Sequence, residues 1–147
     1  MLTEITLKDK EIIELLSQLE NTYISLKNKR KELVLQIKDS ESGILMHEYI
    51  RCGKKNCKCY NGGALHGPYW YHYYWENGKL KKRYICPVRK PNAKFQELYN
   101  KIENNKQNKQ IQRQIKEIDN KLIKIENNKK KIKNELRELL KKIQDNK

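Results

Sequence analysis

The stretch CGKKNCKCYNGGALH at residues 52–66 decides how this chain folds, because it places four potential metal ligands within fifteen residues. Three thiols and one imidazole satisfy the donor set of a closed, four-coordinate Cys3His zinc site. A structural zinc ion is the expected cofactor, since a head of about 50 residues with a single sheet needs an additional crosslink to be stable. The predicted ligands are Cys52, Cys57, Cys59 and His66, with Cys86 as the alternative fourth ligand.

Residues 1–42 have the pattern of a long helix. Apolar residues follow alternating spacings of four and three, which is the a/d repeat of a coiled coil, interrupted once at Arg30. Thr6 or Asp9 would cap the start of this helix, and residues 40–43 would end it. The repeat consists of Ile12, Leu16, Leu19, Tyr23, Leu26, Arg30, Leu33 and Ile37.

A second, longer helix is predicted for residues 92–147, because Pro91 and Asn92 form a typical helix start. An upstream apolar stripe ends at Ile102, which lies one residue out of register, and residues 104–110 contain no apolar side chain. We interpret this polar stretch as a stutter or as a solvated part of the helix. The later repeat comprises Ile111, Ile115, Ile118, Leu122, Ile125, Lys129, Ile132, Leu136, Leu139 and Ile143.

The segment between the helices, residues 43–91, predicts a small antiparallel sheet. Residues 69–75 are rich in strand-forming aromatics, and a second apolar and basic run follows at residues 80–86. Asn77-Gly78 between the two runs is the strongest short signal for a β-hairpin, since both residues accept a positive φ. A third strand is expected at residues 44–51, leading into the first cysteine.

Together these elements predict an α+β fold, in which a long antiparallel coiled-coil helical hairpin carries a small metal-stabilised antiparallel β head. A first helix of about 30 residues would span about 45 Å, and a second of about 50 residues would span about 75 Å. If the helices pair outward from the head, the first ends near residue 125 and leaves the seam at residues 125–143 exposed. We expect this seam to mediate self-association or to bind a helical partner.

The net charge of +15 is unevenly distributed. Residues 1–42 carry 7 basic and 8 acidic side chains, residues 43–91 carry 10 and 2, and residues 92–147 carry 16 and 8. A basic excess in the head and the second helix favours a polyanionic partner, with nucleic acid ahead of an anionic membrane surface. DNA is expected ahead of RNA.

The aromatic strand and the lysines around it suggest how nucleic acid would be bound. Alternation places Tyr69, Tyr71, Tyr73 and Trp75 on one face and Trp70, His72 and Tyr74 on the other, so that one face is core and the other is free. Free aromatic rings next to cations are typical of nucleic-acid binding, by base stacking or by a β-ribbon in a groove. The candidate contacts are Lys54, Lys55, Lys58, Tyr71, Tyr73, Trp75, Lys79, Lys81, Lys82 and Arg83.

The sequence contains no signature of an enzyme, a membrane protein or an exported protein. A catalytic zinc site needs a general base and an open position, and neither H-E-x-x-H nor a nucleotide-binding glycine motif is present. No stretch approaches the roughly 20 apolar residues that span a bilayer, and residues 1–10 lack the order of a secretory signal. We therefore expect a non-enzymatic cytoplasmic protein with reduced cysteines.

The motif CGxxNCxC at residues 52–59, followed by HGPY at residues 66–69, resembles a family of unknown function found in prokaryotes and their mobile elements. The resemblance covers residues 44–90 and a following helix. It implies metal binding by Cys52, Cys57, Cys59 and His66 but supplies no activity, and Cys86 lies outside the pattern. The β-hairpin is also similar in pattern to the arm-site DNA-binding domains of phage-type integrases.

The function expected from the sequence is therefore nucleic-acid binding by a zinc-stabilised β head on a coiled-coil stalk. The alternative is a coiled-coil assembly or adaptor protein, in which the zinc head has no role in nucleic-acid binding.

Overall fold

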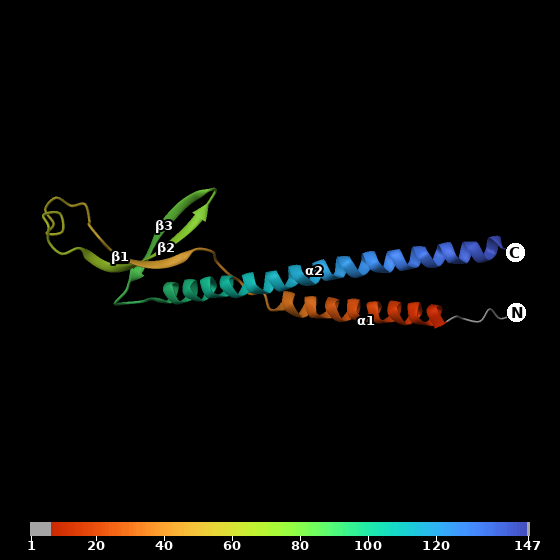
Figure 1. Ribbon diagram of the computed structural model, residues 1–147. Coiled ribbons are helices and arrows are strands. Elements are labelled where there is room, and N and C mark those ends of the chain that lie inside the picture. Colours follow the sequence, from red (N-terminus) through yellow and green to blue (C-terminus); the bar gives the residue numbers. More distant parts are fainter. Residues whose placement is uncertain (1–6, 147) are drawn as a thin grey trace. The chain divides into compact units, whose positions relative to one another are not determined.

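The computed structural model describes residues 7–146 and consists of two helices and a three-stranded sheet (Figure 1). This confirms the predicted α+β class. The described residues form two compact units: residues 7–36 with 110–146, and residues 37–109. The element order is α1 (Leu7–Leu35), β1 (Ile44–Ile50), β2 (His66–Glu76), β3 (Lys79–Pro87) and α2 (Ala93–Asp145).

The helical unit is held together by contacts between α1 and the part of α2 that follows residue 110. Arg30 Nε donates to Asp119 Oδ1 at 2.7 Å, and Tyr23 donates its hydroxyl hydrogen to Glu126 at 3.1 Å. Further along, the ammonium group of Lys129 pairs with the carboxylate of Glu20. Because the residue number rises in one helix as it falls in the other, the two segments run in opposite directions (Figure 1).

The predicted apolar repeats lie on the sides of the helices that face each other. Leu33, Ile118 and Ile125 are buried, and most of the other repeat positions are half-buried. The two polar residues within the repeats, Arg30 and Lys129, are the ones that form ion pairs across the unit. Each interruption of the pattern is therefore matched by a carboxylate on the opposite helix.

The expectation that the outer, N-terminal end of the first helix lies opposite residue 125 is wrong. Ile125 is only 9% exposed, and Ile12 and Leu15 line a shared apolar groove with Ile132 and Leu136. The reason is that α1, which ends at Leu35, pairs with α2 only beyond residue 110, since residues 37–109 form a unit of their own. Within residues 7–146, only the far part of the predicted seam is bare: Leu139, Leu140 and Ile143 are 47%, 59% and 53% exposed.

The polar stretch at residues 104–110 of α2 is only partly solvated, because two of its asparagines bind the connection between α1 and β1. Asn108 is 4% exposed; its Oδ1 accepts from Lys38 N at 3.1 Å and its Nδ2 donates to Lys38 O at 2.7 Å. Asn104 Nδ2 donates to the carbonyl of Asp39 at 3.0 Å. The asparagines thus supply partners for backbone groups of a connection that has no helix or strand of its own.

The sheet has the order β1-β2-β3 with antiparallel pairing throughout. Asn77 and Gly78 join β2 to β3 with φ values of 50° and 75°, which fits the predicted type I′ turn. Asn92 caps α2, since its Oδ1 accepts from Phe95 N at 3.0 Å. The predicted sheet, turn and second helix start are confirmed, whereas the alternative first-helix cap Thr6 lies outside the described residues.

The two faces of β2 have different surroundings. On the inner face, which carries Trp70, His72 and Tyr74, Trp70 stacks on Phe95 of α2 with ring centroids 5.0 Å apart. Leu98 and Ile102 of the same helix are buried, so Ile102 departs from the later repeat because it belongs to the packing of the head.

No helix among the described residues is long and apolar enough to cross a membrane.

We predict that Asn108→Ala destabilises the protein by about 1–3 kcal/mol, because it removes both hydrogen bonds that the buried Asn108 amide makes to the backbone of Lys38. Asn127→Ala, the same change at an exposed position of α2, is the matched control and should cost less than about 0.5 kcal/mol. Urea unfolding followed by circular dichroism measures both values. Equal losses in the two variants would contradict a structural role for Asn108.

Candidate metal centre and basic surface

The four predicted ligands are brought together by the loop between β1 and β2. We call residues 51–65 the metal loop; Cys52 lies just after β1, and His66 is the first residue of β2. Three backbone hydrogen bonds fold the loop: Cys57 N to Lys54 O at 3.1 Å, Tyr60 N to Cys57 O at 3.1 Å, and Gly63 N to Lys58 O at 2.8 Å. The tight approach at Gly63 requires glycine, because a Cβ there would lie 2.5 Å from the carbonyl oxygen of Lys58.

The donor atoms of the four residues fit a single metal ion. The Sγ atoms of Cys52 and Cys59 are 3.5 Å apart, Cys57 Sγ is 3.2 Å from His66 Nε2, and all four donor atoms lie within 4.8 Å of one another. Ligands of a tetrahedral ion bound at the usual metal–sulfur distance are about 3.7 Å apart. Cys52, Cys57, Cys59 and His66 can therefore hold a metal ion.

Cys86 does not belong to this cluster. It lies on β3 opposite Trp70, and its side chain is 2% exposed. The group of potential ligands among the described residues contains His66 in the fourth position. The structure therefore brings His66, and not the alternative ligand Cys86, close to the other three predicted ligands.

The thiols of the cluster have unequal acidity. The backbone N–H of Cys59 and the side chain of His66 lower the pKa of Cys57 to about 6, so that Cys57 is a thiolate at neutral pH. A backbone hydrogen bond at Cys52 favours the thiolate of Cys59, but burial and the neighbouring sulfurs together raise the pKa of Cys59. A bound cation would stabilise both as thiolates, which is the form that binds metal.

The metal loop carries four cations and contains no carboxylate of its own. Residues 49–75 contain no aspartate or glutamate. Arg51, Lys54, Lys55 and Lys58 are exposed and form no ion pair with any residue that the structure describes. These four side chains are therefore free to bind an external anion, and Arg51 was not among the residues predicted from the sequence.

The cations of the β-hairpin, by contrast, are mostly paired. The ammonium groups of Lys81 and Lys82 pair with the carboxylates of Glu76 and Glu48, and these contacts raise the pKa values of both lysines. Lys79 is exposed and has no ion-pair partner within the described part of the chain. The predicted basic strand thus offers less free positive charge than its sequence indicates.

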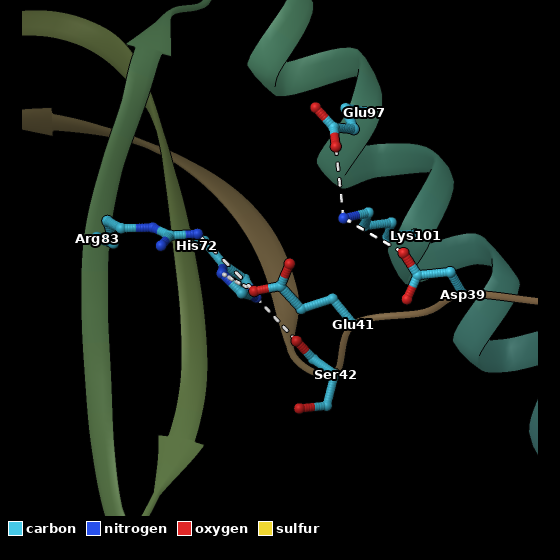
Figure 2. Close-up of polar contacts among 7 residues, drawn as sticks. All are labelled: Asp39, Glu41, Ser42, His72, Arg83, Glu97 and Lys101. Atoms are coloured by element: carbon cyan, nitrogen blue, oxygen red, sulfur yellow. Dashed lines mark hydrogen bonds and ion pairs between the residues drawn. The ribbon is translucent and has the colours of Figure 1, made fainter.

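Arg83 belongs to a polar cluster on the inner side of the sheet, which Figure 2 shows. Its guanidinium lies 3.8 Å from Glu41, which in turn lies 3.9 Å from Nδ1 of the fully buried His72. The other ring nitrogen of His72 donates to the carbonyl of Ser42 at 2.8 Å, since a carbonyl can only accept. This cluster borders a cleft of about 510 Å³ between β3 and α2 that also contains Lys101.

The three predicted stacking residues differ in exposure. Tyr71 is buried at 8% exposure, because Lys82 lies over its ring at 4.1 Å and Tyr84 packs against its edge. The sequence predicted that Tyr71 is an exposed aromatic residue, and this prediction is wrong. Tyr73 is half-buried and donates its hydroxyl hydrogen to Glu48, whereas Trp75 is 69% exposed.

The chain matches the model of a protein family described as a domain of unknown function (DUF6788) over residues 9–94. Because this region is more than half of the 147 residues, the chain belongs to that family. The match begins well before the expected residue 44 and includes nearly all of α1, the metal loop and the sheet. Searches among curated proteins and among solved structures found no match to this chain.

We predict that Cys59→Ser abolishes metal binding, whereas Cys86→Ser leaves one ion bound per chain. The two thiols are matched in burial, at 1% and 2% exposed, but only Cys59 is part of the cluster. Elemental analysis of the purified proteins measures the bound metal, and near-ultraviolet circular dichroism reports the packing of the aromatic strand. Retention of a full equivalent by Cys59→Ser, or its loss from Cys86→Ser, would refute the assigned ligand set.

Proposed function

We propose that this protein is a nucleic-acid-binding module in which a zinc-stabilised β head presents free cations to the phosphate backbone. The observation that carries the proposal is the group of four unpaired cations on the metal loop, Arg51, Lys54, Lys55 and Lys58. Phosphate contacts supply most of the affinity of nonspecific nucleic-acid binding and require cations that are not already neutralised.

Zinc is the ion that we propose for the cluster. Three thiolates and one imidazole are soft and borderline ligands, which favour zinc over magnesium or calcium. Four protein ligands fill a tetrahedral coordination sphere, so the proposed role of the ion is structural. The bound ion would hold the metal loop in the conformation that exposes its lysines.

The proposed stalk is an antiparallel coiled coil formed by α1 and the later part of α2. The heptad repeats of both helices and the ion pairs Arg30–Asp119 and Glu20–Lys129 support this proposal. A second candidate function of the stalk is to bind a helical partner or a second copy of the chain. The exposed Leu139 and Ile143 favour this role, because they continue the heptad repeat and such an apolar stripe is rarely left bare.

The partner that we propose is DNA ahead of RNA, bound through its backbone. Lys79 is the further hairpin cation that is free to contribute, whereas Lys81, Lys82 and Arg83 would first have to leave their carboxylates. We therefore propose that the metal loop contributes more to binding than the hairpin does.

We predict that replacing Lys54, Lys55 and Lys58 together by glutamine weakens DNA binding about tenfold or more and makes it less sensitive to salt. Loss of three phosphate contacts should reduce the slope of log affinity against log salt by about 2–3. The matched control replaces three exposed lysines of α2, Lys121, Lys124 and Lys130, and so removes the same charge. Fluorescence anisotropy at several salt concentrations measures both.

Equal weakening in the two triple variants would show that only net charge matters and would refute binding by the metal loop. Metal content is measured in each variant, so that loss of the ion is not mistaken for loss of a phosphate contact. Wild-type protein that binds no DNA or RNA at low salt would refute nucleic-acid binding itself and leave the helical partner as the remaining candidate.

A further inference from the structure

The side of the sheet away from α2 is unusually apolar and aromatic for an uncovered surface. We call this side the outer face; its register pairs show that it comprises Ile44, Met46, Glu48, Tyr69, Tyr71, Tyr73, Trp75, Leu80, Lys82 and Tyr84. The opposite side is covered, since Trp70 stacks on Phe95. The strands of an antiparallel sheet normally place polar residues on the uncovered face, whereas most residues on this face are apolar or aromatic.

Large side chains on the outer face are open to solvent. Trp75 is 69% exposed, Leu80 is 56% exposed and Tyr84 is 51% exposed. On β1, Ile44 and Met46 are 54% and 46% exposed. Contiguous exposed apolar surface of this kind marks a binding site.

The charges around the outer face favour an anionic ligand. At one end of β2 lies the metal loop with its unpaired cations, and at the other end Lys79 begins β3 without an ion-pair partner among the described residues. The one carboxylate on the outer face, Glu48, is neutralised by Lys82 and accepts a hydrogen bond from Tyr73. An apolar protein partner would not need cations at both ends of the surface.

We infer that the outer face binds single-stranded nucleic acid, with Trp75 and Tyr84 as the platforms on which bases stack. Exposed aromatic rings next to a cationic track are how proteins bind single strands, since every base offers a π-face. In a duplex the base faces are stacked on one another and cannot reach these rings. The inference rests on the proposed function and specifies the form of nucleic acid that the head takes.

The positions of the two rings set how the strand would lie. Trp75 pairs with Leu80, and Tyr84 lies four residues further along β3 on the same face, which is about 13 Å. The two rings would therefore stack on different bases. Lys82 lies between them and covers Tyr71, so Tyr71 supports the platform without contacting a base.

The test compares a labelled single-stranded DNA oligonucleotide with the duplex of the same sequence, using fluorescence anisotropy at fixed salt. Wild-type protein should bind the single strand at least tenfold more tightly than the duplex. Trp75→Ala and Tyr84→Ala should each weaken single-strand binding by about 5- to 100-fold, the usual effect of losing one stacked base. Tyr60→Ala, the control, removes a ring that is 50% exposed on the metal loop and not on the outer face, and should leave single-strand affinity within about twofold of wild type.

Two results would overturn the inference and leave the proposed function standing. The first is binding to the duplex that is as tight as binding to the single strand. The second is unchanged single-strand affinity in both aromatic variants, while the metal-loop triple variant still binds weakly. Absence of binding to the single strand, to the duplex and to an RNA strand of the same sequence would overturn both proposals. In that case, analytical ultracentrifugation would test whether two copies of the chain bind each other through the outer face. A wild-type dimer that becomes a monomer in Trp75→Ala would support this alternative.

Discussion

The convergence of four metal ligands at the base of the β1–β2 connection is the constraint on which the head depends. Strands β1 and β2 pair along most of their length, but the chain between them makes an excursion of fifteen residues that contains no strand or helix. Ordering such a loop costs conformational entropy that a few turn hydrogen bonds cannot offset. A metal ion bound by this cluster, in which every donor lies within 4.8 Å of the others, would close the loop at four points. The lysines of the loop are exposed.

The longer helix contributes to both compact units, and its sequence changes character accordingly. Near its start, Phe95, Leu98 and Ile102 supply apolar contacts to the head. The polar residues that follow, Asn104 and Asn108, bind backbone groups instead of side chains. Only beyond residue 110 does the heptad pattern pair with another helix. The three zones differ because each has a different neighbour, namely a sheet, an extended segment and a helix.

Local signals in the sequence were sufficient wherever the structure depends on neighbouring residues. The Asn77-Gly78 turn, the Asn92 cap and the spacing of the metal ligands all involve groups a few residues apart, and each was predicted. Features that depend on residues far apart in the sequence were not predicted. The hydrogen bonds of Asn108 depend on Lys38, which is 70 residues away in the sequence, and the burial of Tyr71 depends on Lys82 across the sheet. The pairing of the hairpin cations with Glu41, Glu48 and Glu76 likewise became visible only in three dimensions.

The charge of the proposed metal centre bears on which surface can attract an anion. A divalent ion bound by three thiolates and a neutral imidazole leaves the site with one net negative charge, because the three negative ligands exceed the charge of the ion. Four unpaired cations, Arg51, Lys54, Lys55 and Lys58, surround that site, so the metal loop as a whole stays strongly positive. The hairpin carries as many cations, but three of its four lie next to the carboxylates of Glu76, Glu48 and Glu41. The metal loop therefore has more unpaired cations than the β-hairpin, and a strand bound as we propose would make more of its phosphate contacts there.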